Sequence, residues 1–139
     1  MDMNKAFFLR KEDRAPQWHV IDAQNKILGR LATQVADILS GKTKTNFAPH
    51  TDNGDYVVII NAKDIALSGT KMDQKIYTRV SGWIGGKKEI LAKDVHRKDP
   101  TRLIHLAVKG MLPKNSLAAV MLTRLRIYEG SDHPHTHHV

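Results

Sequence analysis

The residues of this sequence best suited to chemistry are lysines beside glycine-rich or helix-starting segments, and that chemistry is anion binding. Lys109 and Lys114 flank a turn between two helical patterns. There the free N–H groups at a helix N-terminus would add to their charge, which makes the turn a candidate phosphate site. A solvated helical connection, in which the lysines only confer solubility, fits the same spacing. Both interpretations stay open.

The glycine-rich segment of residues 82–88 (GWIGGKK) invites comparison with nucleotide-binding loops. The NTPase loop needs GxxxxGK followed by Ser or Thr. Here Ser81 stands where its first glycine belongs, and Lys88 where its hydroxyl belongs. No GxGxxG dinucleotide motif follows the first expected strand either. We therefore expect either a compact loop that contacts a phosphate chain or a glycine turn with solvated lysines. Its candidate contact residues are Gly85, Gly86, Lys87 and Lys88.

Two further groups of polar residues can be assigned chemistry. His50, Asp52 and Asp55 lie close together before an apolar run, where they could do acid–base work or bind a cation. Asx residues beside glycine are also ordinary turn chemistry, and we favour a structural loop in which His50 faces a phosphate. The last seven residues contain four histidines (His133, His135, His137 and His138). Such a tail binds zinc or nickel in vitro, but a physiological metal site needs a fixed geometry, so we expect none.

The basic charge is regional. The chain has 22 Lys and Arg against 14 Asp and Glu, a formal net charge of +8. Residues 71–126 hold 13 basic and 4 acidic side chains, which leaves 9 basic and 10 acidic elsewhere. A regional excess favours binding to a phosphate backbone, because each neutralised phosphate releases counterions. Nucleic acid is favoured over an anionic membrane, since no basic amphipathic helix carries bulky aromatic anchors.

Length and composition predict one domain of 139 residues, with an arm at residues 1–16, an α/β domain at 17–130 and a His-rich tail at 131–139. No apolar run is long enough for a membrane helix, and the N-terminus has no secretory pattern. The absence of cysteine fits a reducing, intracellular compartment.

The apolar pattern alternates between strand and helix periods, which predicts a mostly parallel sheet. The expected strands are residues 18–22, 56–60, 65–67, 75–80 and 126–128. One helix should run from 27 to 39 and end at Gly41. Helix-compatible sequence resumes near Ile90 and breaks at Asp99-Pro100. A helix from about 101 should end at Gly110 and Pro113, and the next should be capped by Asn115 or Ser116.

Several motifs together resemble the bacterial form of the large-subunit ribosomal protein L13 family, over nearly the whole chain. The motifs are WHVIDA at 18–23, LGRLAT at 28–33, PH at 49–50, GDY at 54–56, NA at 61–62, SG at 68–69 with Lys71, the glycines 82, 85 and 86, and AVKGMLPK at 107–114. Residues 115–118 and the tail depart from the usual family pattern.

The resemblance implies a three-layer α/β/α fold with a small, mainly parallel sheet. The polar composition of the two ends independently predicts a flexible N-terminal arm and a flexible C-terminal tail. It implies a structural, non-catalytic role in the large subunit, in the cytoplasm, without cofactor, metal, membrane or small-molecule substrate. The expected partners are large-subunit ribosomal RNA, during early assembly, and neighbouring ribosomal proteins, with messenger RNA a secondary possibility.

Because the chain has few aromatic pockets for splayed bases, we expect it to recognise RNA by shape and phosphate contacts. Trp83 is the exception, since it can either stack on a base or pack inside the protein. The residues expected to contact RNA are Lys42, Lys44, His50, Lys71, Gly85, Gly86, Lys87, Lys88, Lys109, Lys114, Arg124 and Arg126.

Overall fold

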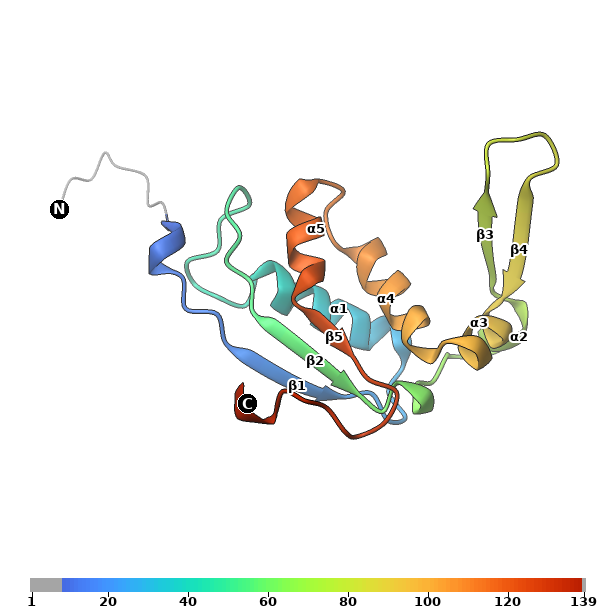
Figure 1. Cartoon of the computed structure of the whole chain (residues 1–139), viewed down its shortest axis with the longest axis horizontal. Coiled ribbons are helices and arrows are strands. Elements are labelled where there is room, and N and C mark those ends of the chain that lie inside the picture. The colour runs from blue at the N-terminus through green and yellow to red at the C-terminus, as the bar shows by residue number, and fades with distance from the viewer. Residues whose placement is uncertain (1–8, 139) are drawn as a thin grey trace.

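The computed structural model describes residues 9–138, which form an α/β domain around a three-stranded sheet (Figure 1). The strands are β1 (Trp18–Asp22), β2 (Tyr56–Ile60), β3 (Ile76–Val80), β4 (Lys87–Leu91) and β5 (Leu125–Ile127). The α-helices are α1 (Leu28–Ser40), α2 (Lys71–Gln74), α3 (Ala92–Lys98), α4 (Pro100–Met111) and α5 (Ser116–Thr123). Three single 3₁₀ turns are η1 (Lys11–Asp13), η2 (Ala62–Asp64) and η3 (Thr136–His138).

The sheet has the order β1-β2-β5, and both strand pairs are parallel. The central strand β2 is an unbroken run of β-branched and aromatic residues, as expected of a strand covered on both faces. Its neighbours are in register, with Trp18 beside Tyr56 and Leu125 beside Val57. The expected α/β class with a small, mainly parallel sheet is confirmed.

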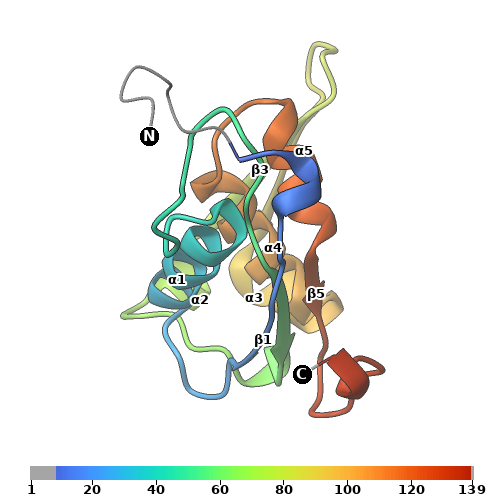
Figure 2. The ribbon, with the colours of Figure 1, turned by 90° about the vertical axis from the view of Figure 1, so that its left-hand side faces the viewer.

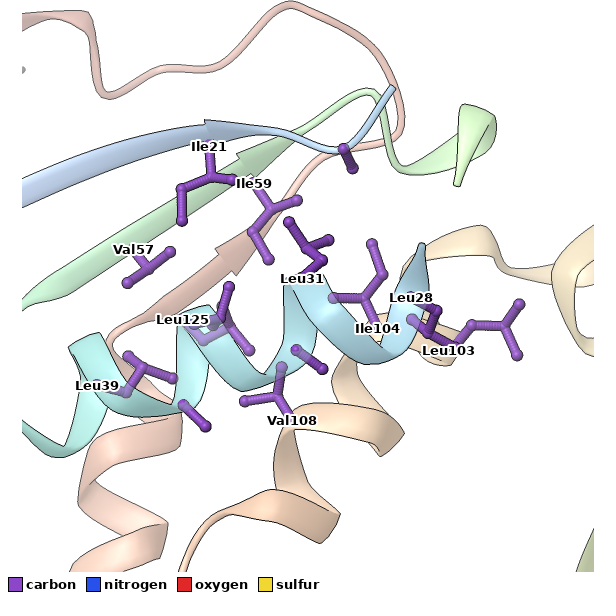
Figure 3. Close-up of a cluster of buried hydrophobic side chains, with 14 of the residues drawn as sticks. Ile21, Leu28, Leu31, Leu39, Val57, Ile59, Leu103, Ile104, Val108 and Leu125 are labelled. Carbon is purple, nitrogen blue, oxygen red and sulfur yellow. The ribbon is translucent and has the colours of Figure 1, made fainter. Parts of the chain in front are cut away.

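Helices α1, α4 and α5 pack on one face of this sheet. Side chains of the strands, such as Ile59 and Leu125, point toward Leu31 of α1 and Ile104 of α4 (Figure 3). Their burial removes most of the apolar surface of these elements from water, which is the main stabilising term for such a core. The apolar residues whose helical spacing predicted α1 therefore form its buried face. The helix ends as expected at Gly41 (φ 78°).

The other face of the sheet is covered by the C-terminal segment. Trp18 stacks on Tyr56 with ring centroids 4.4 Å apart, and the ring of His135 lies 5.0 Å from that of Trp18. The Tyr128 hydroxyl is 2.9 Å from Nε2 of His135. The histidine-rich tail thus has a defined place in the structure up to residue 138. Of the expected N-terminal arm, residues 1–8 lie outside the described part.

Helix boundaries around α4 follow local chemistry, with one correction. Asp99 caps α4 by accepting hydrogen bonds from the N–H groups of Thr101 and Arg102, and Asn115 caps α5 in the same way through Ala118. The prediction that Gly110 ends the helix was wrong, because α4 continues through it to Met111. Leu112 is extended instead, as the residue before a proline must be.

Strands β3 and β4 form an antiparallel hairpin that projects away from the domain (Figures 1 and 2).

Two predictions about this part of the chain were wrong. Residues 65–67 were expected to form a strand, but they make only an isolated bridge between Ala66 and Ile27. Helix was expected to resume near Ile90, but Ile90 lies in β4 and the next helix begins at Ala92. Short apolar runs do not distinguish strand from helix by period alone.

No helix within residues 9–138 is long and apolar enough to span a membrane.

Candidate nucleic-acid interface

Three of the motif segments, far apart in sequence, meet around one hollow of about 340 Å³. The start of α1 contributes Leu28 and Gly29, the segment leading into α2 contributes Ser68 and Lys71, and the end of α4 contributes Ala107, Gly110 and Met111. We call this the motif hollow. The Thr33 hydroxyl on α1 donates to the Gly29 carbonyl oxygen at 3.0 Å, and Sδ of Met111 on α4 lies 3.5 Å from the same hydroxyl oxygen, so the two helices are in contact beside the hollow.

The motif hollow combines bare backbone with positive charge. A Cβ added at Gly29 or at Gly110 would meet no other atom within 4 Å, so each glycine leaves its helix surface open toward solvent. Lys71 is exposed and donates to Ser68 Oγ at 3.0 Å, and the Lys75 ammonium lies 5.4 Å from the Tyr77 ring. Neither lysine is paired with a carboxylate among the described residues. Such a surface lets a phosphodiester backbone approach closely between two cations.

The β3–β4 hairpin places cations opposite each other. Arg79 is directly across from Lys88, and Tyr77 across from Ile90 on the same face. Like charges directly opposite one another destabilise a strand pair. A phosphate bound between Arg79 and Lys88 would relieve that repulsion, so this face of the hairpin is suited to a polyanion. On the opposite face Lys87 is engaged by Glu89 at 2.5 Å.

The tip of the hairpin exposes large apolar side chains. Trp83 is 83% exposed and Ile84 is fully exposed. Packing within this chain therefore does not explain Trp83, whose ring is available for stacking. Gly85 and Gly86 complete the tight turn, and Gly85 needs its positive φ of 75° there. This turn connects antiparallel strands, whereas a phosphate-binding NTPase loop connects a strand to a helix, which excludes that reading of the glycines.

Arg124, one of the residues expected to contact RNA, has a structural position in the folded chain. It is 9% exposed, and its guanidinium donates to the carboxylate of Asp52, to the Gly54 carbonyl oxygen at 3.1 Å and to the Leu39 carbonyl oxygen at 3.4 Å. A phosphate could reach it only by displacing these partners. Sequence shows a basic residue near the chain end but not its burial.

Lys44 is similarly engaged, because its ammonium lies 2.6 Å from the Asp55 carboxylate. Asp55 also accepts a hydrogen bond from the Gln17 N–H at 2.8 Å and lies 3.2 Å from Nε2 of His19. Burial pushes the pKa of Asp55 upward, but the hydrogen bonds from Gln17, Lys44 and His19 outweigh it, so this pKa lies below its usual value. Asp52 and Asp55 therefore hold the loop of residues 49–55 together. This agrees with the structural role that the sequence favoured over an acid–base or cation site.

The other expected residues lie on several different elements. Lys42 is exposed 3.7 Å from Asp37, and His50 is exposed in the loop before β2. Lys109 and Lys114 are exposed at the end of α4 and in the turn before α5, and Arg126 is exposed on β5. Of the expected residues, Lys71 lies in the motif hollow and Lys88 lies on the hairpin. Sequence reasoning missed Lys75, Arg79, Gly29 and Gly110, because only the fold brings these four to the two surfaces.

The C-terminal histidines pack rather than cluster. His133 lies against Tyr128 with ring centroids 6.2 Å apart, and His135 contacts Trp18 and Tyr128. In the part of the chain that the structure describes, no group of three or more His, Asp or Glu side chains is arranged to hold a metal ion.

Comparison with known proteins gives one family. A family model described as Ribosomal protein L13 matches residues 16–134. The large ribosomal subunit protein uL13 of Dictyoglomus thermophilum is 50% identical over 131 residues, 94% of this chain and 92% of its own length. The protein of the same name from Kocuria rhizophila is 53% identical over 119 residues, 86% of this chain and 81% of its own. That from Thermotoga maritima is 48% identical over 133 residues, covering 96% and 89%.

Proposed function

The chain belongs to the ribosomal protein L13 family, and from this premise we propose that it is a structural constituent of the large ribosomal subunit. It has no catalytic role, in keeping with a family of structural proteins. It acts in the cytoplasm, bound to large-subunit ribosomal RNA and to neighbouring ribosomal proteins. It joins the subunit early in assembly, when RNA helices are still being brought together.

The observation that carries the RNA-binding part of this proposal is the motif hollow. Segments at residues 28–33, 68–71 and 107–114 supported the family resemblance from sequence, and the fold gathers parts of all three around one opening. Buried packing does not require open glycines such as Gly29 and Gly110, because their added Cβ atoms would meet nothing. A negatively charged ligand that lies against the helix backbones, near Lys71 and Lys75, would explain both the open glycines and the two lysines.

The β3–β4 hairpin is the second proposed RNA surface, through Arg79, Lys88 and the exposed Trp83. Its projection from the domain lets it reach an RNA segment that the motif hollow does not touch. Two contacts on separate elements would fix the relative position of two RNA segments, which is how a structural protein promotes assembly. Messenger RNA outside the ribosome would bind the same two surfaces as a secondary ligand. The remaining proposed contact residues are Lys42, His50, Lys87, Lys109, Lys114 and Arg126.

Sedimentation of a cell lysate tests the proposal. Ribosomal subunits are separated on a sucrose gradient at low magnesium, washed at moderate salt, and the protein is quantified in each fraction by mass spectrometry. One copy per large subunit is expected. Recovery only near the top of the gradient would contradict a structural role.

A paired variant links the role to the motif hollow. Lys71→Ala/Lys75→Ala should weaken binding to a large-subunit RNA fragment and reduce the slope of log K against log salt by about two, since two phosphate contacts are lost. Lys63→Ala is the control, because Lys63 is exposed but pairs with Glu129 at 3.1 Å, away from the motif hollow. Equal slopes of log K against log salt for the two variants would show that the motif hollow is not part of the RNA interface.

A further inference from the structure

A second groove, of about 500 Å³, lies between α4 and the free edge of the sheet at β5. Leu125 and Ile127 of β5 form one wall, and Arg102, His105 and Lys109 of α4 lie along the other. We call this the edge groove. It shares no lining residue with the hairpin and only Leu106 with the motif hollow. The motif hollow and the hairpin therefore do not account for it, although Lys109 in its wall is also one of the remaining proposed RNA contact residues.

The backbone of β5 presents to the edge groove hydrogen-bonding groups that have no backbone partner among the described residues. The Arg124 carbonyl oxygen accepts from Val57 N–H, and Tyr128 N–H donates to the Ile59 carbonyl oxygen, so residues 124, 126 and 128 face β2. In a parallel ladder the alternate residues point their backbone groups the other way. The N–H and C=O groups of Leu125 and Ile127 therefore face away from β2, and no described strand pairs with them on that side.

The wall formed by α4 is basic. Arg102, His105 and Lys109 recur every three or four residues, which places them on one face of the helix, and all three are exposed. Asp99, at one end of the edge groove, is already engaged as the cap of α4 by the N–H groups of Thr101 and Arg102. The apolar Leu106 lies between the cations. The groove therefore combines two basic side chains and a histidine with an apolar floor.

We propose that the edge groove receives an extended acidic segment of another protein, which pairs with β5 as a fourth strand of the sheet. The alternating donors and acceptors of Leu125 and Ile127 match a peptide backbone. Phosphate oxygens accept hydrogen bonds but cannot donate them, so phosphate groups would leave the β5 carbonyl groups unpaired. Carboxylates at alternate positions of the segment would face Arg102, His105 and Lys109.

The length of the contact is short. Three residues of β5 span about 10 Å, and the rise from Arg102 to Lys109 along α4 is about the same. A segment of three or four residues therefore fills the edge groove. If the chain has the proposed ribosomal role, this segment belongs to a neighbouring ribosomal protein. The inference rests on the proposed function only for where the partner is found.

Peptide binding to the isolated full-length chain tests the inference without using the ribosome. The probe is an eight-residue peptide library with glutamate fixed at alternate positions and Val, Ile or Thr elsewhere, and the matched library carries lysine instead of glutamate. The glutamate library should bind saturably by fluorescence polarisation and protect the amides of Leu125 and Ile127 from hydrogen exchange. The lysine library should bind at least tenfold more weakly.

Two variants separate backbone pairing from charge. Ile127→Pro removes the N–H that faces the edge groove without removing a bond to β2, whereas Ile127→Ala keeps that N–H. The proline variant should bind the glutamate library at least tenfold more weakly than the alanine variant. Arg102→Glu should weaken the glutamate library and strengthen the lysine library. Thermal unfolding of each variant confirms that the fold is retained.

Three results would overturn the inference. They are absence of binding by the glutamate library, equal binding by the two Ile127 variants, and protection of the Leu125 and Ile127 amides by a large-subunit RNA fragment in place of the peptide. None of these alters the sedimentation result, so failure of this inference is distinct from failure of the proposed ribosomal role.

Discussion

Arg124, the residue between α5 and β5, donates a hydrogen bond to the carboxylate of Asp52 in the loop before β2. The two side chains are each 11% exposed. Gly54, two residues after Asp52, approaches α1 so closely that an added Cβ would lie 1.7 Å from the Leu39 carbonyl oxygen. The same carbonyl group accepts from Arg124. This contact joins the end of α1, the loop and the start of β5.

Arg124→Ala should therefore reduce stability strongly. Among the described residues, the buried Asp52 carboxylate then keeps one nearby cation, Arg14 at 3.9 Å, and two carbonyl oxygens lose this donor. Removing one partner of a buried ion pair typically costs about 3 to 5 kcal/mol. Urea unfolding measures the loss, and Arg126→Ala, at an exposed position two residues on, should change stability by less than about 0.5 kcal/mol. Similar losses for both variants would contradict a structural role for Arg124.

Asp55 should make stability depend on pH below neutrality. Its pKa in the folded chain is lower than in the unfolded chain, where it is about 3.9. The stabilisation is therefore complete above the unfolded pKa and is lost as the pH falls through it toward the folded pKa. Asp55→Asn should be less stable at pH 7 and lose less stability between pH 5 and pH 3. Urea unfolding across this range tests it, with Asp64→Asn as an exposed control whose profile should match the wild type.

Gly110→Gln should separate RNA binding from stability. Gln favours helix over Gly by several tenths of a kcal/mol, and its Cβ meets no atom, so the melting temperature should stay equal or rise. The longer side chain would occupy the motif hollow and lower affinity for a large-subunit RNA fragment. The control is Gly130→Gln, at another glycine with open space, outside the motif hollow. Unchanged RNA affinity in Gly110→Gln would argue that no RNA enters the motif hollow.

Trp83→Ala tests the tip of the hairpin. Because Trp83 is 83% exposed, its removal should leave thermal stability almost unchanged. If its ring stacks on an RNA base, affinity should fall by about 1 to 3 kcal/mol, measured by filter binding or fluorescence. Trp83→Phe keeps an aromatic face and should recover much of the loss. A full loss of affinity in the phenylalanine variant would point to a contact other than stacking.

The periodic parts of the chain were predictable because their patterns are local. The strands at 18–22 and 56–60 have the bounds expected from sequence, and α1 ends at Gly41, where a left-handed backbone is needed. Strand β4 was not predicted, since a glycine turn followed by lysines carries no strand period. Pairing with β3 decides that conformation, and the residues of β4 taken alone do not show this pairing.

The candidate site was predictable only in part, for the same reason. Lysine content identified a basic surface, but charge along the chain does not tell an exposed lysine such as Lys71 from one held by a carboxylate, as Lys44 is by Asp55. Charge alone likewise placed Arg124 among the residues expected to contact RNA, without showing that its side chain is buried. The carboxylates that engage Lys44 and Arg124 are 11 and 72 residues away, respectively.

The sequence by itself determined the family, the α/β class, the Gly41 end of α1, the cap region of α5 and the regional excess of positive charge, because motifs, period and composition are properties of neighbouring residues. Within residues 9–138, tertiary structure alone decided which cations lack a carboxylate partner, which glycines open onto the motif hollow and which backbone groups of β5 have no partner. Those properties depend on what distant segments bring to the same place, and packing rather than local preference sets that arrangement.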